Sequence, residues 1–378
     1  MANHDILTLT DNTHLSLARP GTLGRDLRAW DAADELLLAH LREDGAAKGR
    51  VLVIDDQFGA LATGLAACTP ELLLDSARSI RATAANLQAN GLSALPLHSW
   101  LTPPQGEFDT IVLRIPRQLA YLEYLLRWIN DHLAPGGRVW AGGMIRHIPD
   151  RCAALFADLL VTETVLPARK KARVVVAGCG TTGLEGWRGH WQGYQAQGMT
   201  LQALPAVFAR EQLDIGSRLL LPHIKACVDR LPPASRVLDL GCGNGLLGMA
   251  ALTARPDLQV CFSDVSSQAV LSAKANAASA GVADQALFYH ADGVDPGMLP
   301  CQRVLLNPPF HEGGAVGDHL ALMLFSQARR ALTADGQLLL VGNRHLGYHA
   351  TLKRYYAQVR QLDANAKFVV LEAALTAS

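Results

Sequence analysis

Three closely spaced glycines, Gly241, Gly243 and Gly245, stand where the chain changes from a strand pattern to a helix pattern. The apolar residues 237–240 (VLDL) precede them and an Ala-rich apolar run follows, which predicts a strand, a tight turn and a helix. Glycine is favoured in such a turn because its backbone adopts positive φ and allows a bound molecule to approach closely. The unpaired N–H groups at the start of the helix can bind an anion. We therefore expect a cofactor site at this turn.

A second candidate group follows the apolar residues 301–306 (CQRVLL), where the chain continues as Asn307, Pro308, Pro309 and Phe310. Proline has no N–H to donate to a sheet, so the strand should end here. In a parallel sheet this end lies beside the glycine turn. This places Asn307 and Phe310 at the carboxyl end of the strand. We predict that these four residues are catalytic; an ordinary proline-rich turn is the alternative.

The order of residues 239–245, D-x-G-x-G-x-G, resembles motif I of S-adenosylmethionine (SAM) methyltransferases. Residues 243–248 also read G-x-G-x-x-G, the fingerprint of a dinucleotide site. However, Asp239 lies inside the predicted strand and Gly241 already ends it, which favours SAM over a nicotinamide cofactor or a structural turn. An N-P-P-[FYW] tetrad after such a turn resembles the signature of amino methyltransferases.

Two further acidic residues follow predicted strands in this half of the chain. Asp264 comes about 25 residues after Asp239, where a carboxylate can accept both ribose hydroxyls of an adenosine group. Asp292 follows the predicted strand 286–290 and could meet the adenine amino group. Both could instead be solvated acids at strand ends. The predicted SAM-binding residues are Asp239, Gly241, Cys242, Gly243, Gly245, Asp264, Asp292 and Asn307.

The chain contains an internal repeat. Residues 51–65 (VLVIDDQFGALATGL) align without gaps with residues 237–251 (VLDLGCGNGLLGMAA), and later landmarks recur in the same order. The further pairs are 72–75 with 261–264, 86–91 with 276–281, 108–117 with 301–310, and 133–139 with 332–338. The spacing of roughly 190 residues is far longer than that of solenoid repeats and indicates two copies of one domain. We expect domains at residues 1–195 and 196–378.

The first copy lacks the residues that would do chemistry. Asp55 and Gln57 replace the first two glycines of the turn, with Asp56 between them. Two carboxylates at a helix start should exclude SAM, whose own carboxylate would lie there. Arg114 and Arg117 replace the asparagine and phenylalanine of the tetrad, and arginine can clamp phosphate. We therefore interpret the first copy as degenerate.

Other segments predict supporting elements. The apolar spacing of residues 27–41 fits an amphipathic helix. Residues 167–173 (PARKKAR) are the densest basic run and lie between the halves, followed by a Gly- and Trp-rich passage at 178–198. The aromatic residues Trp187, Trp191 and Tyr194 could form an RNA-stacking surface or could simply pack between domains.

Composition limits the function classes. The 378 residues are 49% hydrophobic and 18% charged, with a formal net charge of zero, so any nucleic-acid surface must be local. The seven scattered cysteines form no C-x-x-C pair and predict reduced thiols with neither a metal site nor disulfides. No apolar run is long enough for a membrane helix, and the N-terminus lacks a signal-peptide pattern. We expect a cytoplasmic monomer with no membrane partner.

The whole chain resembles the family of bacterial ribosomal RNA guanine-N2 methyltransferases that carry a duplicated methyltransferase domain. Residues 27–38, 208–221, 307–311, 343–349 and 367–373 are most similar to the member that methylates a guanine in 23S rRNA. The resemblance implies an α/β fold of two tandem Rossmann-like class I methyltransferase domains with seven-stranded, mostly parallel sheets. It also implies RNA recognition by the degenerate N-terminal domain, and transfer of a methyl group from SAM to a guanine N2 amine of 23S rRNA by the C-terminal domain. The ending LTAS lacks a basic tail, which weakens the expectation of nonspecific RNA binding.

Several alternatives remain open from sequence. The target could be a guanine N2 amine of 16S rRNA, an amine of a DNA base or a protein glutamine, since each is compatible with N-P-P-[FY]. A catalytically inactive RNA-binding pair is disfavoured by the intact Asp239, Gly241, Gly243 and Asn307. A nicotinamide oxidoreductase would leave the N-P-P-F strand end unexplained.

Overall fold

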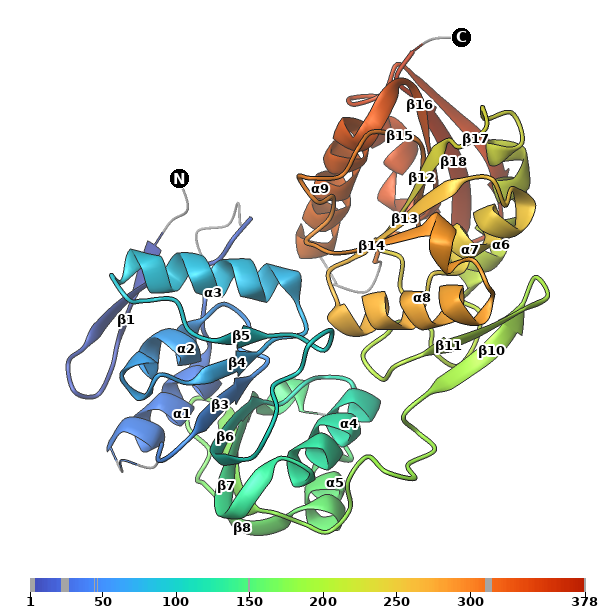
Figure 1. The fold of residues 1–378 in the computed structure, drawn as a ribbon. Coiled ribbons are helices and arrows are strands. Elements are labelled where there is room, and N and C mark those ends of the chain that lie inside the picture. Colours follow the sequence, from blue (N-terminus) through green and yellow to red (C-terminus); the bar gives the residue numbers. More distant parts are fainter. Residues whose placement is uncertain are drawn as a thin grey trace. The chain divides into compact units, whose positions relative to one another are not determined.

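The computed structural model describes residues 4–21, 27–43, 45, 47–148, 150–309 and 315–376. The chain divides into two compact units, Met1–His190 and Trp191–Ser378, so the division lies close to residue 195. Figure 1 shows the elements of each unit along the chain.

The N-terminal unit contains a short hairpin and a mixed α/β arrangement in the described residues. Its strands are β1 His4–Thr8, β2 His14–Ala18, β3 Val51–Ile54, β4 Glu71–Leu73, β5 Leu97–His98, β6 Phe108–Arg114, β7 Leu133–Met144, β8 Val161–Val165 and β9 Ala172–Gly178. Its α-helices are α1 Ala32–Glu43, α2 Ala60–Gly64, α3 Ala77–Ala89, α4 Leu119–Asn130 and α5 Cys152–Leu159.

The C-terminal unit repeats this order of elements in the described residues. Its strands are β10 Gln192–Ala196, β11 Met199–Ala203, β12 Arg236–Leu240, β13 Gln259–Asp264, β14 Ala286–His290, β15 Cys301–Leu306, β16 Leu332–Asn343, β17 Gln358–Ala364 and β18 Phe368–Ala374. Its α-helices are α6 Ile215–Val228, α7 Leu246–Ala254, α8 Ser267–Ser279, α9 Ala315–Ala331 and α10 Tyr348–Leu352.

The two units have the same sheet topology. The seven-stranded sheets have the orders β5-β4-β3-β6-β7-β9-β8 and β14-β13-β12-β15-β16-β18-β17. Neighbouring strands are parallel except for the pairs made by β9 in the first sheet and by β18 in the second. The predicted fold of tandem seven-stranded, mostly parallel domains is therefore confirmed.

Alternating apolar side chains bury both faces of the C-terminal sheet. Val237 and Leu305 face a core formed with α6, α7 and α8, whereas Leu238 and Leu306 face a second core formed with α9 and α10. A strand that is covered on both faces needs apolar residues at successive positions, which explains the nearly continuous apolar runs in β12 and β15. Burial of both faces leaves the carboxyl edge of the sheet to hold polar side chains.

Each unit anchors its hairpin with one buried asparagine of the repeat. The Asn86 side chain accepts a hydrogen bond from Ala18 N (2.8 Å) and donates to the carbonyls of Ala18 and Phe58 (3.0 and 2.7 Å). Asn276 makes the same three contacts, with Gln202 N and O and with the Asn244 carbonyl, at 2.8 to 2.9 Å. The duplication therefore includes the hairpins β1–β2 and β10–β11.

The helix expected at residues 27–41 begins later, at Ala32. Asp31 Oδ1 accepts a hydrogen bond from Ala33 N (2.8 Å), and Asp34 Oδ2 accepts one from Asp31 N (2.9 Å). These reciprocal contacts satisfy N–H groups at the helix start and define the boundary. The predicted start was wrong because the apolar spacing continues across this cap.

The basic run lies within the first sheet and not between the halves. Arg169, Lys170 and Lys171 form the connection between β8 and β9, where Lys170 and Lys171 adopt positive φ angles of 48° and 63°. Lys170 Nζ pairs with Glu35 on α1 at 2.7 Å. The basic run is therefore part of an antiparallel turn of the N-terminal unit.

Candidate active site

The two predicted groups of chemical residues lie at one edge of the C-terminal sheet. The last residue of β12 pairs with Ser263 in β13 on one side and with Leu306, the last residue of β15, on the other. Gly241, Asp264 and Asn307 follow these positions directly, so they lie side by side at the carboxyl edge. In doubly wound sheets this point, where strand order reverses, is where ligands bind.

The glycine turn is open on one side and packed on the other. Gly241, Gly243 and Gly245 have positive φ angles of 72°, 54° and 86°. A Cβ atom added at Gly241 would meet no heavy atom within 4 Å, whereas one at Gly245 would lie 3.1 Å from Ala273 Cβ on α8. The first glycine therefore leaves space for a ligand, and the third allows two helices to pack closely.

Asp264 is tied to the turn by two hydrogen bonds. Its Oδ2 accepts from Gly243 N and its Oδ1 accepts from Ser266 N, each at 2.9 Å. The carboxylate is therefore held at the end of β13, beside the backbone of the glycine turn. Asp292 lies at the next position outward, two residues beyond β14, and is half-buried.

Asp239 lies beneath the turn. Its side chain is buried, and Oδ2 accepts a hydrogen bond from Gly248 N at 2.8 Å. Within the described residues Oδ1 is buried without a hydrogen-bond partner. Burial, with a smaller effect of the Asp264 charge, raises the pKa of Asp239 to about 8. The carboxyl group therefore supports the first turn of α7 from below.

Cys242 also supports the turn. Its side chain belongs to the buried core, and its N–H donates to the Ser263 carbonyl at 3.0 Å. Burial raises the pKa of this thiol well above its usual value. The thiol is thus a packing group that lies on the buried side of the turn.

Asn307 is held by two polar side chains from α6. Its Nδ2 donates to Asp214 Oδ1 (3.2 Å) and to Ser217 Oγ (2.9 Å). Its Oδ1 is shielded from solvent and has no hydrogen-bond partner in the described residues. Pro308 is buried and Pro309 is exposed, while the predicted catalytic residue Phe310 lies outside the described residues.

Sequence reasoning missed Asp214 and Ser217. A signal was present, because Asp-x-x-Ser before the apolar run of α6 is typical of a helix N-cap. Asp214 is that N-cap and accepts a hydrogen bond from Ser217 N at 3.0 Å. Nothing in the local pattern indicates that the same side chains also reach a residue about 90 positions later.

The equivalent turn of the N-terminal unit is filled by its own side chain. Asp56 is buried, and its carboxylate accepts hydrogen bonds from Gly59 N (3.0 Å) and Ala62 N (2.8 Å). Ala62 N corresponds to Gly248 N, which bonds the Asp239 carboxyl group in the second unit, so Asp56 takes the supporting position of Asp239. The two turns therefore differ in the residue that supports them.

The predicted phosphate clamp at Arg114 is wrong. Arg114 is buried and pairs with Asp31 (2.8 Å) and Asp34 (3.3 Å), two carboxylates at the start of α1. An arginine enclosed by carboxylates of its own chain is not available to a phosphate. Arg117 differs, because it is exposed and lies 3.4 Å from the His147 ring.

The pairing of residues 72–75 with 261–264 is also wrong by one position. Ile54 pairs with Leu73, and the equivalent Leu240 pairs with Ser263. Leu74 therefore occupies the position that corresponds to Asp264, and Asp75 lies one residue further along. The first copy thus also lacks the carboxylate at the end of its second parallel strand.

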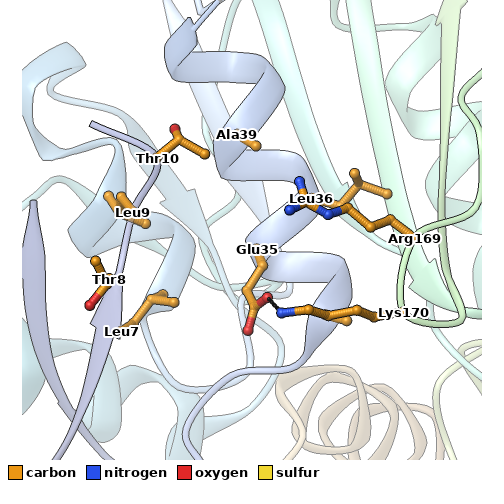
Figure 2. A pocket seen from close by; sticks show the side chains of 10 residues that line it. Leu7, Thr8, Leu9, Thr10, Glu35, Leu36, Ala39, Arg169 and Lys170 are labelled. Atoms are coloured by element: carbon orange, nitrogen blue, oxygen red, sulfur yellow. Dashed lines mark hydrogen bonds and ion pairs between the residues drawn. The ribbon is translucent and has the colours of Figure 1, made fainter. Parts of the chain in front are cut away.

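A small pocket lies in the N-terminal unit beside the basic turn (Figure 2). Its volume is about 150 Å³. It is lined by Leu7, Thr8, Leu9, Thr10, Ala32, Glu35, Leu36, Ala39, Arg169 and Lys170. The Lys170–Glu35 ion pair crosses its wall in Figure 2. Ligand pockets for drug-sized molecules have volumes of roughly 300 to 1,000 Å³, so this one is too small for a nucleoside.

The aromatic residues of the 178–198 passage have packing partners within their own units. Arg127 lies 5.1 Å from the centre of the Trp187 ring. Trp191 packs against a small apolar cluster that includes Leu204, and the Tyr194 hydroxyl accepts a hydrogen bond from Asn244 Nδ2 at 3.2 Å. These contacts favour packing over an RNA-stacking surface, but they lie within each unit, whereas the expectation was packing between domains.

The described residues contain neither a candidate membrane-spanning helix nor a candidate metal cluster. None of their helices combines the length and the hydropathy that a membrane crossing requires. Within the same residues, no three side chains among His, Cys, Asp and Glu are grouped so that they could hold a metal ion.

Comparison with known proteins assigns both halves. The RLMG N-terminal domain model matches residues 6–181, and the Methyltransferase small domain model matches residues 198–372. Ribosomal RNA large subunit methyltransferase G of Ectopseudomonas mendocina is 41% identical over 366 residues, covering 94% of this chain and 96% of the relative. The protein of the same name from Alcanivorax borkumensis is 37% identical, with 93% and 92% covered.

One solved structure matches both units. It is a 16S rRNA N2-guanine methyltransferase of T. thermophilus, in complex with AdoMet and guanosine, with a TM-score of 0.74. The alignment covers 98% of each chain at 24% sequence identity. This likeness supports the fold of two tandem domains.

Proposed function

The chain belongs to the ribosomal RNA large subunit methyltransferase G family, and from this premise we propose that it methylates the exocyclic N2 amine of a guanine in 23S rRNA. SAM is the methyl donor in this proposal. The observation that carries it is the Asn307 side-chain oxygen, buried without a partner in the described residues, at the sheet edge beside the glycine turn.

The residues at the sheet edge fit SAM. The open side of Gly241 allows close approach of the methionine part, and the Asp264 carboxylate at the end of β13 can accept the ribose hydroxyls. Asp292, next along this edge, can accept from the adenine amino group. Asp239 and Cys242 support the turn from its buried side. SAM supplies a methyl group bound to a positively charged sulfur.

The guanine amine requires positioning more than activation. Its nitrogen is conjugated with the ring and is a poor nucleophile, so its lone pair must be aimed at the methyl carbon. Asn307 Oδ1 and the Pro308 carbonyl can accept the two N–H groups and favour a pyramidal nitrogen as positive charge develops. We propose that Phe310 stacks on the base. The methylated amine then loses its proton to water without a dedicated base.

A guanine within a helix cannot reach this edge. Its N2 amine lies in the minor groove, so the nucleotide must be unpaired or flipped out of the stack. We propose that the N-terminal unit serves RNA recognition. Its own turn is filled by Asp56 and its Arg114 is neutralised, so its RNA contacts should come from exposed basic residues such as Arg117, Arg169 and Lys171.

The test uses methyl-labelled SAM with separated 23S and 16S rRNA that lack the modification. We expect label in 23S rRNA, recovered as N2-methylguanosine after digestion to nucleosides. Label in 16S rRNA alone, or at another atom of guanine, would contradict the proposal. Parallel reactions with ribosomal particles show whether naked RNA or an assembly is the better substrate.

A further inference from the structure

We propose that Asp214 and Ser217 are positioning residues that fix the orientation of the Asn307 amide, and that Gly216 leaves room beside its oxygen. The inference deepens the proposed function, on which it rests for the identity of the amine that binds there. It begins from two hydrogen bonds between residues about 90 positions apart.

Asp214 and Ser217 determine which way the NH2 group and the oxygen of the Asn307 amide point. Asp214 Oδ1 already accepts a hydrogen bond from Ser217 N and acts as an acceptor, so it must face the NH2 group of Asn307. A flipped amide would place Oδ1 about 3 Å from a carboxylate oxygen, where two acceptors repel. Ser217 Oγ accepts from the same NH2 group at 2.9 Å. Both amide hydrogens are therefore used, and Oδ1 is left as a pure acceptor.

The two partners are themselves held in place. Asp214 Oδ1 also accepts a hydrogen bond from Ser217 N at 3.0 Å, as the N-cap of α6. Ser217 is 5% exposed, so its side chain has little freedom to turn away. A helix start is a rigid part of the fold, and it transmits this rigidity to the amide.

The two hydrogen bonds of the NH2 group hold Asn307 Oδ1 in a fixed position as an acceptor. Leaving a buried acceptor without a hydrogen bond is unfavourable. The cost is removed when an amine N–H of the substrate donates to it. A preorganised acceptor of this kind needs no reorientation during the reaction.

Gly216 is the third part of the arrangement. A Cβ atom added there would lie 3.1 Å from Asp214 Oδ1, 3.4 Å from Asn307 Oδ1 and 3.5 Å from Val341 Cγ1. Within a helix, glycine is less favourable than alanine by roughly 0.5 to 1 kcal/mol. Its presence in the first turn of α6 is explained by the space that it leaves beside the amide.

The N-terminal unit has residues at the same three positions, but a hydrogen-bond donor replaces the residue that carries the acceptor. Asp31 and Asp34 at the start of α1 correspond to Asp214 and Ser217, and Arg114 corresponds to Asn307. Arginine has no acceptor, so this copy keeps the two supports and has lost the oxygen. The acceptor is therefore not required for folding this arrangement.

The first test compares Ser217→Ala with Ser217→Thr, which retains a hydroxyl. For the alanine variant we expect kcat to fall about five- to tenfold, the effect of about 1 kcal/mol, while the Kd for SAM changes less than twofold. The threonine variant should recover most of the loss. Ser235→Ala is the control, because Ser235 is equally buried but bonds Pro232 O at the opposite end of β12.

The second test separates positioning from stability. Gly216→Ala should change the melting temperature little, because alanine favours the helix while its Cβ would lie only 3.1 Å from Asp214 Oδ1. Its kcat/KM for RNA should nevertheless fall at least tenfold. Unchanged activity in both Gly216→Ala and Ser217→Ala, measured with an active wild-type enzyme, would overturn the inference.

A third measurement needs no substrate. Asparagine side chains labelled with ¹⁵N give NMR signals for each NH2 group, and Asn307→Ala identifies the signal of Asn307. We expect its hydrogens to exchange slowly in the wild type and at least fivefold faster in Ser217→Ala. Equal exchange rates would refute the positioning role even if no rRNA were methylated, and absence of methylation with protected hydrogens would refute only the proposed function.

Discussion

At the residue scale, the candidate site contains two carboxyl groups that differ in burial and in structural role. Asp264 is part of the open edge, whereas Asp239 is enclosed beneath the glycine turn and has its pKa raised to about 8. A buried acid with an elevated pKa is neutral in the folded protein at neutral pH. Asp239 therefore combines a hydrogen bond to Gly248 with little net charge near the cofactor.

The elevated pKa of Asp239 predicts a pH-dependent stability. The folded pKa lies above the unfolded value of about 3.8, so the associated stabilisation is complete below pH 4 and is lost as the pH rises toward 8. Asp239→Asn should remove this loss. Its free energy of unfolding, relative to wild type, should increase by up to about 4 kcal/mol between pH 5 and pH 8, measured by urea denaturation.

The matched control is Asp257→Asn, since Asp257 is solvent-exposed and its pKa is lowered to about 2 by Arg255. This variant should follow the wild-type slope between pH 5 and pH 8. Parallel curves for Asp239→Asn and wild type would show that Asp239 is ionised in the fold.

Asn307 gives the second prediction at this scale. Asn307→Ala should abolish methyl transfer, because the acceptor for the target amine is lost, and should leave the affinity for SAM within a few-fold. Single-turnover rates with labelled SAM, together with calorimetric SAM titrations, measure the two effects. Near-wild-type turnover would remove Asn307 from the mechanism.

At the element scale, an equivalent buried asparagine ties each hairpin to its domain. Asn276 on α8 bonds both backbone groups of Gln202 in β11 and the carbonyl of Asn244 in the glycine turn. This single buried side chain thus links the hairpin, α8 and the cofactor turn. The equivalent Asn86 makes the same contacts in the first unit.

Asn276→Ala should therefore affect both stability and cofactor binding. It leaves three backbone groups without their partners, of which the Asn244 carbonyl is buried, and we expect a loss of roughly 1 to 3 kcal/mol. Chemical denaturation and SAM titration measure the two effects. Asn86→Ala is the control: it should destabilise to a similar extent while the folded protein retains the wild-type Kd for SAM.

At the scale of the whole molecule, two copies of one fold have diverged at equivalent positions. In the C-terminal unit the turn after β12 contains three glycines, and asparagine follows β15. In the N-terminal unit Asp56 fills the turn and Arg114 is enclosed by Asp31 and Asp34. Each unit has its own buried core, so the two can be tested separately.

We predict that residues 191–378 bind SAM and that residues 1–190 do not. The glycine turn, Asp264 and Asn307 all belong to the second unit, whereas the corresponding turn of the first is closed by a carboxylate. Isothermal titration of each purified unit measures this directly. Binding by residues 1–190 alone would reverse the assignment of the domains.

The basic turn of the N-terminal unit gives a prediction about RNA. Replacing Arg169, Lys170 and Lys171 together by alanine should weaken RNA binding and flatten its salt dependence, by about 0.7 to 0.9 in log–log slope per lost phosphate contact. SAM binding should not change. Because Lys170 also pairs with Glu35, Glu35→Ala serves as the control for loss of that ion pair. A lowered melting temperature with unchanged RNA affinity would mark the turn as structural.

Sequence by itself determined the duplication, the sheet strands and the meeting of two motifs at one edge. Strand and helix patterns depend on local alternation of apolar residues, and proline and glycine end strands wherever they occur. For this reason the predicted strands 286–290 and 301–306 coincide with β14 and β15. The convergence of Gly241 and Asn307 then follows from the geometry of any parallel sheet.

Tertiary structure decided which side chains meet. Asp214 and Ser217 reach Asn307, and Arg114 is neutralised by Asp31 and Asp34, because helix starts pack against strand ends that are distant in sequence. The one-residue shift that gives Leu74 the position equivalent to Asp264 is visible only in the pairing of strands. Local patterns carry no information about such partners, since a side chain's charge environment is set by the packing of the whole domain.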